Sequence, residues 1–338
     1  MPSSDLPDAA EPRRDGGFST QPRRGSAGSA GAGRAVLAFD VGGTDIKAAV
    51  FDEHGTALGL SRTQTPPAGE RMPQRLVARL AELAGELRAQ HPHVIPEAAG
   101  LVVPGIVDDA AGIGVFSSNL GWRDAPLRAL AAQALELPVA FDHDVRSAAW
   151  AEHVLGGARA FDDAVVLIIG TGIAGALILG GRPHTAGGYA GEIGHSPIGD
   201  WPCPCGATGC LEAIASAGAI ARRYAESTGT AVAGAEEVIA RAAGGDVDAQ
   251  RVWDDALDAL ALAIAQLSAV LAPEAIVIGG GLSRAGAALF GELDLRLRAR
   301  LSFHRIPQLV RAELSGNAGL LGSALRAREV LEGTDHSR

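Results

Sequence analysis

A strand–glycine turn–strand pattern occurs twice in this chain, and the repetition limits the folds open to it. The predicted strands are 35–40 and 45–52 around the turn Gly42–Thr44, and 164–169 and 173–179 around the turn Gly170–Gly172. Backbone N–H groups at such a tip can hold phosphate oxygens, although Gly42 and Gly43 alone would suit an ordinary hairpin. No G-x-x-x-x-G-K-[ST] sequence is present, so neither turn is a Walker motif. Two copies predict a duplicated architecture with two turns that face phosphate.

Length, composition and charge narrow the classes of function. A chain of 338 residues with 47% apolar residues can bury the cores of two domains. Its net charge of −10 and pI near 5.4 argue against a nucleic-acid partner, because phosphate backbones are bound by clustered Lys and Arg. No apolar run reaches the roughly 20 residues of a membrane-spanning helix, so we expect no membrane partner.

The first 34 residues differ in composition from the rest of the chain. Residues 1–34 are rich in Ser, Gly, Ala, Pro and Arg and hold almost no large apolar residue, which predicts a disordered tail. They contain no apolar h-region of a secretory signal. We therefore expect a cytoplasmic protein whose cysteines stay reduced and free to bind metal.

All three cysteines lie within eight positions, shortly after a histidine. Cys203, Cys205 and Cys210 follow His195, and a Cys₃His set of four protein ligands is typical of structural zinc sites. The odd number of cysteines in a large chain disfavours a disulfide framework. The alternative is a chance cluster in which one thiol is reactive.

Two acidic residues flank this cluster. Glu192 precedes His195 by three residues, and Glu212 follows Cys210 by two. A zinc ion would hold both carboxylates against a pocket. Carboxylates accept hydrogen bonds and so suit a polyhydroxylated ligand such as a sugar. Either glutamate on its own could equally be a solvated loop acid.

Polar residues also follow strands, where α/β sheets bind ligands. Asp40 ends the first strand, where a carboxylate can hold Mg²⁺ through water. Asp144 lies between a strand predicted at 138–141 and a helix predicted at 145–154. Ligands bind beyond the carboxyl ends of such strands, and the helix dipole favours ionised Asp144; an N-terminal helix cap is its alternative role. Asn119, on a Gly-flanked loop, offers an amide to a ligand.

The remaining segments complete an α/β pattern. Helices are predicted at 73–90, 127–137, 248–271 and from about 319, and strands at 98–103, 274–278 and 309–314. The strand 274–278 ends in Gly279, Gly280 and Gly281. Three glycines between a strand and a helix allow a nucleotide base and its ribose to approach the backbone closely.

These motifs resemble those of the ROK family (repressors, open reading frames and sugar kinases), within the sugar-kinase, heat-shock-ATPase and actin superfamily. The resemblance runs from about residue 35 to the C-terminal helix. Its most specific part is Glu192-x-x-His195 followed by Cys-x-Cys-Gly-x-x-Gly-Cys-x-Glu. It implies an α/β, two-lobed actin-like ATPase fold of duplicated ribonuclease-H-like lobes, with a structural zinc loop at 195–210. The smaller lobe would comprise 35–146 plus about 318–338, and the larger lobe 147–317.

The resemblance also implies a hexokinase or glucokinase with ATP, Mg²⁺ and a hexose in the cleft between the lobes. Asp144 matches the general base that takes the proton of the sugar hydroxyl; phosphoryl transfer otherwise needs a metal and donors around the phosphates. The implied sugar contacts are Asn119, His143, Asp144, Glu192, His195 and Glu212. The implied ATP and phosphate contacts are Asp40, Gly42, Gly43, Thr44, Lys47, Gly170, Thr171, Gly172, Gly279, Gly280 and Gly281. The implied zinc ligands are His195, Cys203, Cys205 and Cys210.

One position departs from the family pattern. The family usually places Asn immediately before the catalytic Asp, whereas this chain has His143 there. A neutral histidine offers one donor and one acceptor, but in a larger ring. We therefore expect kinase chemistry to be retained and the choice of sugar to be affected. Glucose, giving glucose 6-phosphate, is the expected substrate, with other hexoses or N-acetylhexosamines as alternatives.

Two other functions stay open. Some family members are transcriptional regulators with a helix-turn-helix domain ahead of the core, for which residues 1–34 are too few and too polar. A non-catalytic sugar-sensing protein is the second alternative, because one residue of the implied sugar site is altered. Retention of Asp144 and of both turns favours the enzyme. The family precedent suggests a homo-oligomer, either a dimer or a tetramer.

Overall fold

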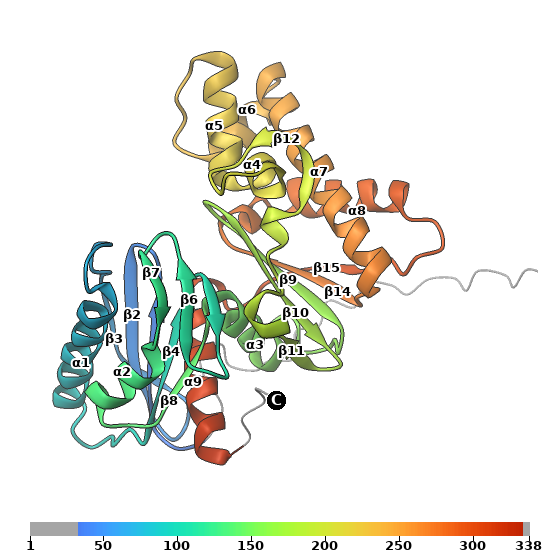
Figure 1. Ribbon diagram of the computed structural model, residues 1–338. Coiled ribbons are helices and arrows are strands. Elements are labelled where there is room, and N and C mark those ends of the chain that lie inside the picture. The colour runs from blue at the N-terminus through green and yellow to red at the C-terminus, as the bar shows by residue number, and fades with distance from the viewer. Residues whose placement is uncertain (1–32, 334–338) are drawn as a thin grey trace, which may run out of the picture.

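Two five-stranded sheets with the same strand order form the framework of the protein (Figure 1). The computed structural model describes residues 33–333. The first sheet has the order β3 (Ala57–Gln64), β2 (Asp45–Phe51), β1 (Val36–Val41), β4 (Ala98–Val103) and β8 (Val139–His143). The second has the order β11 (Arg182–His184), β10 (Ile173–Leu179), β9 (Ala164–Ile169), β14 (Ala275–Gly279) and β15 (Gln308–Arg311).

The strand directions repeat as well. In the first sheet β1 pairs antiparallel with β2 and parallel with β4, and in the second β9 pairs antiparallel with β10 and parallel with β14. The outer strands continue these directions: β3 and β11 are antiparallel to their neighbours, and β8 and β15 are parallel to theirs. The duplicated architecture predicted from the two glycine turns is confirmed.

Helices and small elements connect and cover these sheets. The α-helices among residues 33–333 are α1 (Met72–Gln90), α2 (Leu127–Leu135), α3 (Asp144–Leu155), α4 (Leu211–Ala215), α5 (Ala217–Thr228), α6 (Ala235–Ala243), α7 (Val247–Leu271), α8 (Ala287–Arg300) and α9 (Ala318–Glu332). The shorter elements are β5 (Ile106–Asp108), β6 (Ile113–Ser117), β7 (Trp122–Ala125), β12 (Pro197–Pro202), β13 (Thr208–Cys210) and the 3₁₀ turns η1 (Ala186–Gly188), η2 (Ile193–His195), η3 (Gly281–Ala285) and η4 (Ser315–Asn317). Helix α2 ends two residues before its predicted end, because Glu136 takes a left-handed conformation with φ of 56°.

The first sheet is covered on both faces. Side chains alternate along a strand, so Leu37 and Phe39 of β1 pack with residues of α1 and α2. Val36 and Ala38 pack on the opposite face with residues of α9. This two-sided burial explains why β1 reads as a continuous apolar run.

Helix α3 lies between the two sheets. Its Ala151 belongs to the core that α9 forms with the first sheet, and its Ala149 packs with residues of the second sheet. The chain crosses between the sheets twice, through residues 156–163 after α3 and through residues 312–317 before α9. The predicted boundary between residues 146 and 147 falls within α3, and the lobe boundaries stay a prediction.

The other face of the second sheet carries most of the remaining helices (Figure 1). The longest, α7, begins after Asp246, whose carboxylate accepts hydrogen bonds from Asp248 N and Ala249 N, each at 3.0 Å. None of the helices between residues 33 and 333 combines the length and the hydropathy needed to cross a bilayer. Of the predicted tail, residues 1–32 lie outside the described residues, and Gly33 N donates to Glu53 O at 2.8 Å.

Candidate active site

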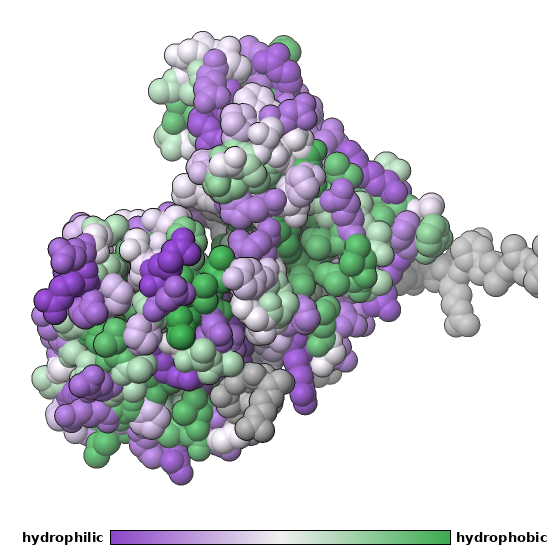
Figure 2. Space-filling model, in the orientation of Figure 1, coloured by the Kyte–Doolittle hydropathy of each residue, from purple (hydrophilic) through white to green (hydrophobic). Residues whose placement is uncertain are grey.

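A cavity of about 360 Å³ lies between the two sheets. Asp40 of β1 and Asp144 at the start of α3 line it from the side of the first sheet, and Gly279–Gly281, at the end of β14, line it from the side of the second. The space-filling view shows the molecular surface hollowed between the bodies that carry the two sheets (Figure 2). Residues singled out at the ends of three separate strands therefore meet in one cavity.

Asp40 is a largely buried carboxylate beside Lys47, the only lysine in the sequence. Lys47 Nζ lies 3.3 Å from Asp40 Oδ2 and donates to Gly316 O at 2.7 Å. A Cβ on Gly319 would lie 2.8 Å from the Asp40 carboxylate, so the first turn of α9 sits against it. Burial raises the pKa of Asp40, an effect that Lys47 opposes and the charge of Asp144 reinforces. A divalent cation would favour the ionised form, so Asp40 suits a site for metal-bound phosphate.

Asp144 is the first residue of α3, and His143 caps the helix. His143 Nδ1 accepts a hydrogen bond from Arg146 N at 3.4 Å, so the alternative that Asp144 is the N-cap is wrong. Asp144 Oδ1 accepts from Val145 N at 2.7 Å, and 25% of the side chain remains exposed. His143 Nε2 lies 3.3 Å from Asp144 Oδ1. Asp144 therefore presents a partly exposed carboxylate to the cavity.

A buried ion-pair network lies beneath these two residues, and our sequence analysis missed it. Asp142 is 3% exposed and pairs with Arg146 and with Arg326, whose Nε donates to Asp142 Oδ2 at 2.9 Å. Burial alone would raise the pKa of Asp142, but Arg326 and Arg146 outweigh burial and hold that pKa below its ordinary value. Arg326 comes from α9, 184 positions away. The only local signal is an arginine four residues after Asp142.

A second cavity, of about 520 Å³, lies beside the first. Gly281 and Arg284 line both cavities. The remaining lining includes apolar side chains of α6 and η3, such as Ile239 and Leu282. A charged cavity joined to an apolar one suits a ligand with an anionic end and a flat apolar end. The wall from α6 was not predicted, because an alanine-rich helix carries no motif.

The second glycine turn is held by Glu212. The Glu212 Oε2 atom accepts a hydrogen bond from Ile173 N at 2.7 Å. A Cβ on Gly172 would lie 2.4 Å from the same oxygen, so a larger residue there would displace the Glu212 carboxylate. Gly170 O accepts from Ala217 N at 2.8 Å, which attaches the turn to the start of α5. Glu212 is thus a contact of the turn Gly170–Gly172, and is not the free loop acid that the sequence left as an alternative.

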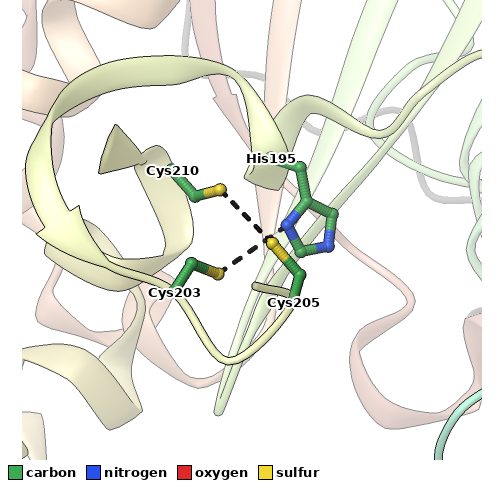
Figure 3. A group of neighbouring side chains, drawn as sticks. All are labelled: His195, Cys203, Cys205 and Cys210. Carbon is green, nitrogen blue, oxygen red and sulfur yellow. Dashed lines mark hydrogen bonds between the residues drawn. The ribbon is translucent and has the colours of Figure 1, made fainter. Parts of the chain in front are cut away.

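The four predicted metal ligands converge on one point, as Figure 3 shows. The ligand atoms of His195, Cys203, Cys205 and Cys210 all lie within 4.8 Å of one another. Cys205 Sγ lies 3.6 Å from Cys210 Sγ, and Cys203 Sγ lies 3.9 Å from His195 Nδ1. A tetrahedral ion with metal–sulfur bonds of about 2.3 Å spaces its ligands by about 3.8 Å. The donor set and its spacing therefore fit one zinc ion.

The other predicted sugar contacts are more dispersed. His143 and Glu192 line a small cavity together. Asn119 is exposed and lies beside the first glycine turn, where a Cβ on Gly43 would be 3.9 Å from Asn119 Nδ2. His195 belongs to the metal cluster, in a separate loop. Of the predicted nucleotide contacts, Asp40, Lys47 and Gly279–Gly281 share one cavity, whereas Gly42–Thr44 and Gly170–Gly172 are not among the residues that line it.

Comparison with known proteins yields one family across nearly the whole chain. A sequence model of the ROK family matches residues 36–330. N-acetylmannosamine kinase of Escherichia coli is 34% identical over 306 residues, which cover 88% of this chain and 99% of that protein.

Two solved structures share the fold. The ROK hexokinase of Thermus thermophilus is 34% identical with a TM-score of 0.76, over 89% of this chain and 99% of that one. The ROK family glucokinase of Streptomyces griseus, solved in complex with glucose and AMPPNP, is 29% identical with a TM-score of 0.73, over 87% of this chain and 99% of that one.

Proposed function

Because the chain belongs to the ROK family and has its two-lobed actin-like ATPase fold, we propose that it is an ATP-dependent hexose kinase. One observation carries the proposal: Asp40, Lys47, Asp144 and Gly279–Gly281 line a single cavity between the two sheets. That cavity combines a carboxylate for a metal-bound phosphate, a cation for phosphate, a proton acceptor and exposed backbone, which are the requirements of phosphoryl transfer.

The two adjoining cavities support a proposed position for ATP. We infer that adenosine occupies the apolar cavity beside α6, against Gly281 and Arg284. The triphosphate would then extend past Gly279–Gly281 towards Lys47 and Asp40. The turns Gly42–Thr44 and Gly170–Gly172 would supply backbone N–H groups to the phosphates. Mg²⁺ bound with ATP would offset phosphate charge, with Asp40 holding it through water.

Asp144 is the proposed general base. As the sugar hydroxyl oxygen attacks the γ-phosphorus, the bond from that phosphorus to the β–γ bridging oxygen breaks and ADP leaves. The hydroxyl proton passes to the carboxylate of Asp144, which must be ionised to accept it. General-base catalysis of this kind contributes typically about 10²–10⁴-fold in rate.

The sugar is proposed to lie between Asp144 and the metal loop. Asn119, His143, Glu192, His195 and Glu212 are its proposed contacts, as the family resemblance implies. We propose glucose, phosphorylated to glucose 6-phosphate, because the cited structural relatives include a glucokinase solved with glucose. N-acetylmannosamine is the second candidate, because a kinase of that sugar is 34% identical to this chain.

The metal loop is proposed to be structural. A zinc ion on His195, Cys203, Cys205 and Cys210 would have four protein ligands and no open position for a substrate. It would fix the loop from which Glu192 and Glu212 extend. The chain is proposed to act in the cytoplasm as a homo-oligomer, without nucleic-acid or membrane partners.

ADP release, measured with a panel of sugars, tests the function directly. Purified protein with ATP and Mg²⁺ should release ADP with glucose or N-acetylmannosamine and not with sugar omitted. A sugar-sensing protein would bind a sugar in calorimetry without releasing ADP. A regulator of the family would bind DNA and release that DNA on addition of sugar. Either result in place of turnover would contradict the proposed function.

A further inference from the structure

Glu152 is a buried carboxylate at the place where the chain crosses between the two sheets. The residue is 0% exposed and lies on α3, two turns after Asp144. A carboxylate removed from water is costly unless its oxygens are hydrogen-bonded. Its contacts therefore identify what it holds in place.

Both crossings donate backbone hydrogen bonds to this one carboxylate. Gly157 N, in the first crossing, donates to Glu152 Oε2 at 2.8 Å. From the second crossing Glu313 N donates to Oε2 at 3.1 Å, and Leu314 N donates to Oε1 at 2.8 Å. A Cβ on Gly156 would lie 2.1 Å from Oε2, so the first crossing lies directly against the carboxylate.

The two crossings also touch each other directly. Arg159 Nη2 of the first crossing lies 3.5 Å from Glu313 Oε2 of the second, and a Cβ on Gly157 would lie 2.9 Å from Arg311 O, at the end of β15 just before the second crossing. The arginine–glutamate pair is about half exposed, and such pairs contribute little to stability. Among these contacts between the crossings, the hydrogen bonds to Glu152 are thus the ones that are buried.

Position in the cavity alone would make Glu152 a candidate metal ligand, since it lines the same cavity as Asp40 and Asp144. Its hydrogen bonds argue otherwise. Oε1 accepts one amide and Oε2 accepts two, all from backbone. The three amides take up most of the acceptor positions of the carboxylate, so the carboxylate mainly binds the backbone.

We propose that Glu152 is a positioning residue that fixes both crossings at one point, about which the two lobes turn when ligands bind. Kinases close over their substrates, and such closure uses a few residues at the ends of elements as hinges. One end of α3 carries Asp144, and the segment from Arg311 to Gly319 lines the proposed phosphate cavity. Glu152 therefore sets the separation of the proposed base from the proposed phosphates. The inference rests on the proposed function for its effect on turnover.

The test compares Glu152→Gln with Glu274→Gln. Glutamine keeps the size of the side chain but has one acceptor oxygen and a donating NH₂ group, so it cannot accept all three backbone hydrogen bonds that Glu152 accepts. Glu274 Oε2 also accepts two backbone hydrogen bonds, from Asp162 N at 2.8 Å and Asp163 N at 3.3 Å. Its carboxylate bonds to the far end of the first crossing, and the residue is not among those that line the cavity. Each variant is assayed at a temperature at which it is folded.

For Glu152→Gln we expect kcat to fall at least tenfold while the Kd of AMPPNP stays within threefold. The radius of gyration in small-angle X-ray scattering should no longer decrease on addition of sugar and AMPPNP as it does for the parent protein. Glu274→Gln should keep kcat within twofold at a similar loss of melting temperature. Raising the Mg²⁺ concentration should not restore the kcat of Glu152→Gln, whereas it would restore the kcat of a variant with a weakened metal ligand.

A kcat for Glu152→Gln within twofold of the parent, or an equal loss for Glu274→Gln, would overturn the inference. Restoration of kcat by Mg²⁺ would overturn it too.

Hydrogen exchange on the parent protein gives a test that needs no variant. The amides of Gly157, Glu313 and Leu314 should be protected equally with and without sugar and AMPPNP, because a pivot keeps its bonds in both states. A more than tenfold change in their protection would contradict the proposal. A parent protein that binds AMPPNP but turns over no sugar would refute the proposed kinase function. The scattering and exchange results would still show whether Glu152 fixes the point about which the lobes turn.

Discussion

Replacing Cys205 by serine tests whether a zinc ion holds the metal loop. Cys205 is exposed, whereas Cys203 and Cys210 are buried, so Cys205→Ser removes a ligand without opening a cavity in the core. The four proposed ligands enclose the 16 residues from His195 to Cys210. A cross-link that closes a loop of about 15 residues stabilises a protein by about 3 kcal/mol in the chain-entropy treatment. We apply the same treatment to closure by a metal ion.

A loss of this size should be visible in thermal unfolding. One kcal/mol corresponds to a shift of about 2–4 °C for a domain of 150–250 residues, so about 3 kcal/mol predicts a fall of roughly 6–12 °C. Metal analysis of protein purified without chelator should find about one zinc ion per chain, and much less for Cys205→Ser. Asp200→Asn, an exposed change in the same loop, is the matched control and should keep both zinc and melting temperature.

The loop should also affect ligand binding through Glu212, which lies two residues after Cys210 and bonds to Ile173 N. A hydrogen bond to a charged group contributes about 1.5–3 kcal/mol, which sets the upper limit of the effect. We expect the KM values for ATP and sugar to rise severalfold in Cys205→Ser. Parent protein without zinc, or a Cys205→Ser protein that melts within 1 °C of the parent, would refute this reasoning.

Two further substitutions test the residues beside Asp144. His143→Asn should change the ranking of sugars, because an amide replaces a ring that offers one donor and one acceptor. The kcat with the best sugar should stay within about tenfold, and an unchanged ranking would remove His143 from the sugar site. Asp142→Asn should lower the free energy of unfolding at pH 7 by about 3–5 kcal/mol, because it leaves Arg146 and Arg326 buried without their partner. The pKa of Asp142 is below its ordinary value in the folded protein, so its contribution is complete above the unfolded value of about 3.9 and is lost as the pH falls through the folded value. The difference between Asp142→Asn and the parent in urea unfolding should therefore shrink below about pH 4; a constant difference would contradict the ion-pair account.

Local patterns predicted the parts of this fold that depend on local chemistry. The strands at 98–103, 164–169 and 173–179 have the predicted bounds, because apolar runs between glycine turns specify buried strands. The metal cluster could equally be predicted from the sequence, since its ligands lie within 16 residues. Asp40, Asp144 and Gly279–Gly281 were found separately, at strand ends, and share a cavity because the two sheets face each other across it.

Features that depend on distant partners were not predicted. The role of Asp142 requires Arg326 from α9, and the role of Glu152 requires amides more than 160 positions away. Neither residue carries a motif. The alternative role of Asp144 as the cap of α3 was also wrong. Asp is the commoner cap, but here the ring nitrogen of His143 accepts the Arg146 amide.

The most direct test of the central claim is the turnover of Asp144→Asn at saturating ATP and sugar. Asparagine keeps the shape of the side chain but cannot take the hydroxyl proton, so we expect the variant to fold, to bind glucose and AMPPNP with Kd values within about threefold of the parent, and to lose about 10²–10⁴-fold in kcat. A variant that binds both ligands and keeps kcat within a few-fold of the parent would show that Asp144 is not the base, and that the cavity between the two sheets works by a different chemistry.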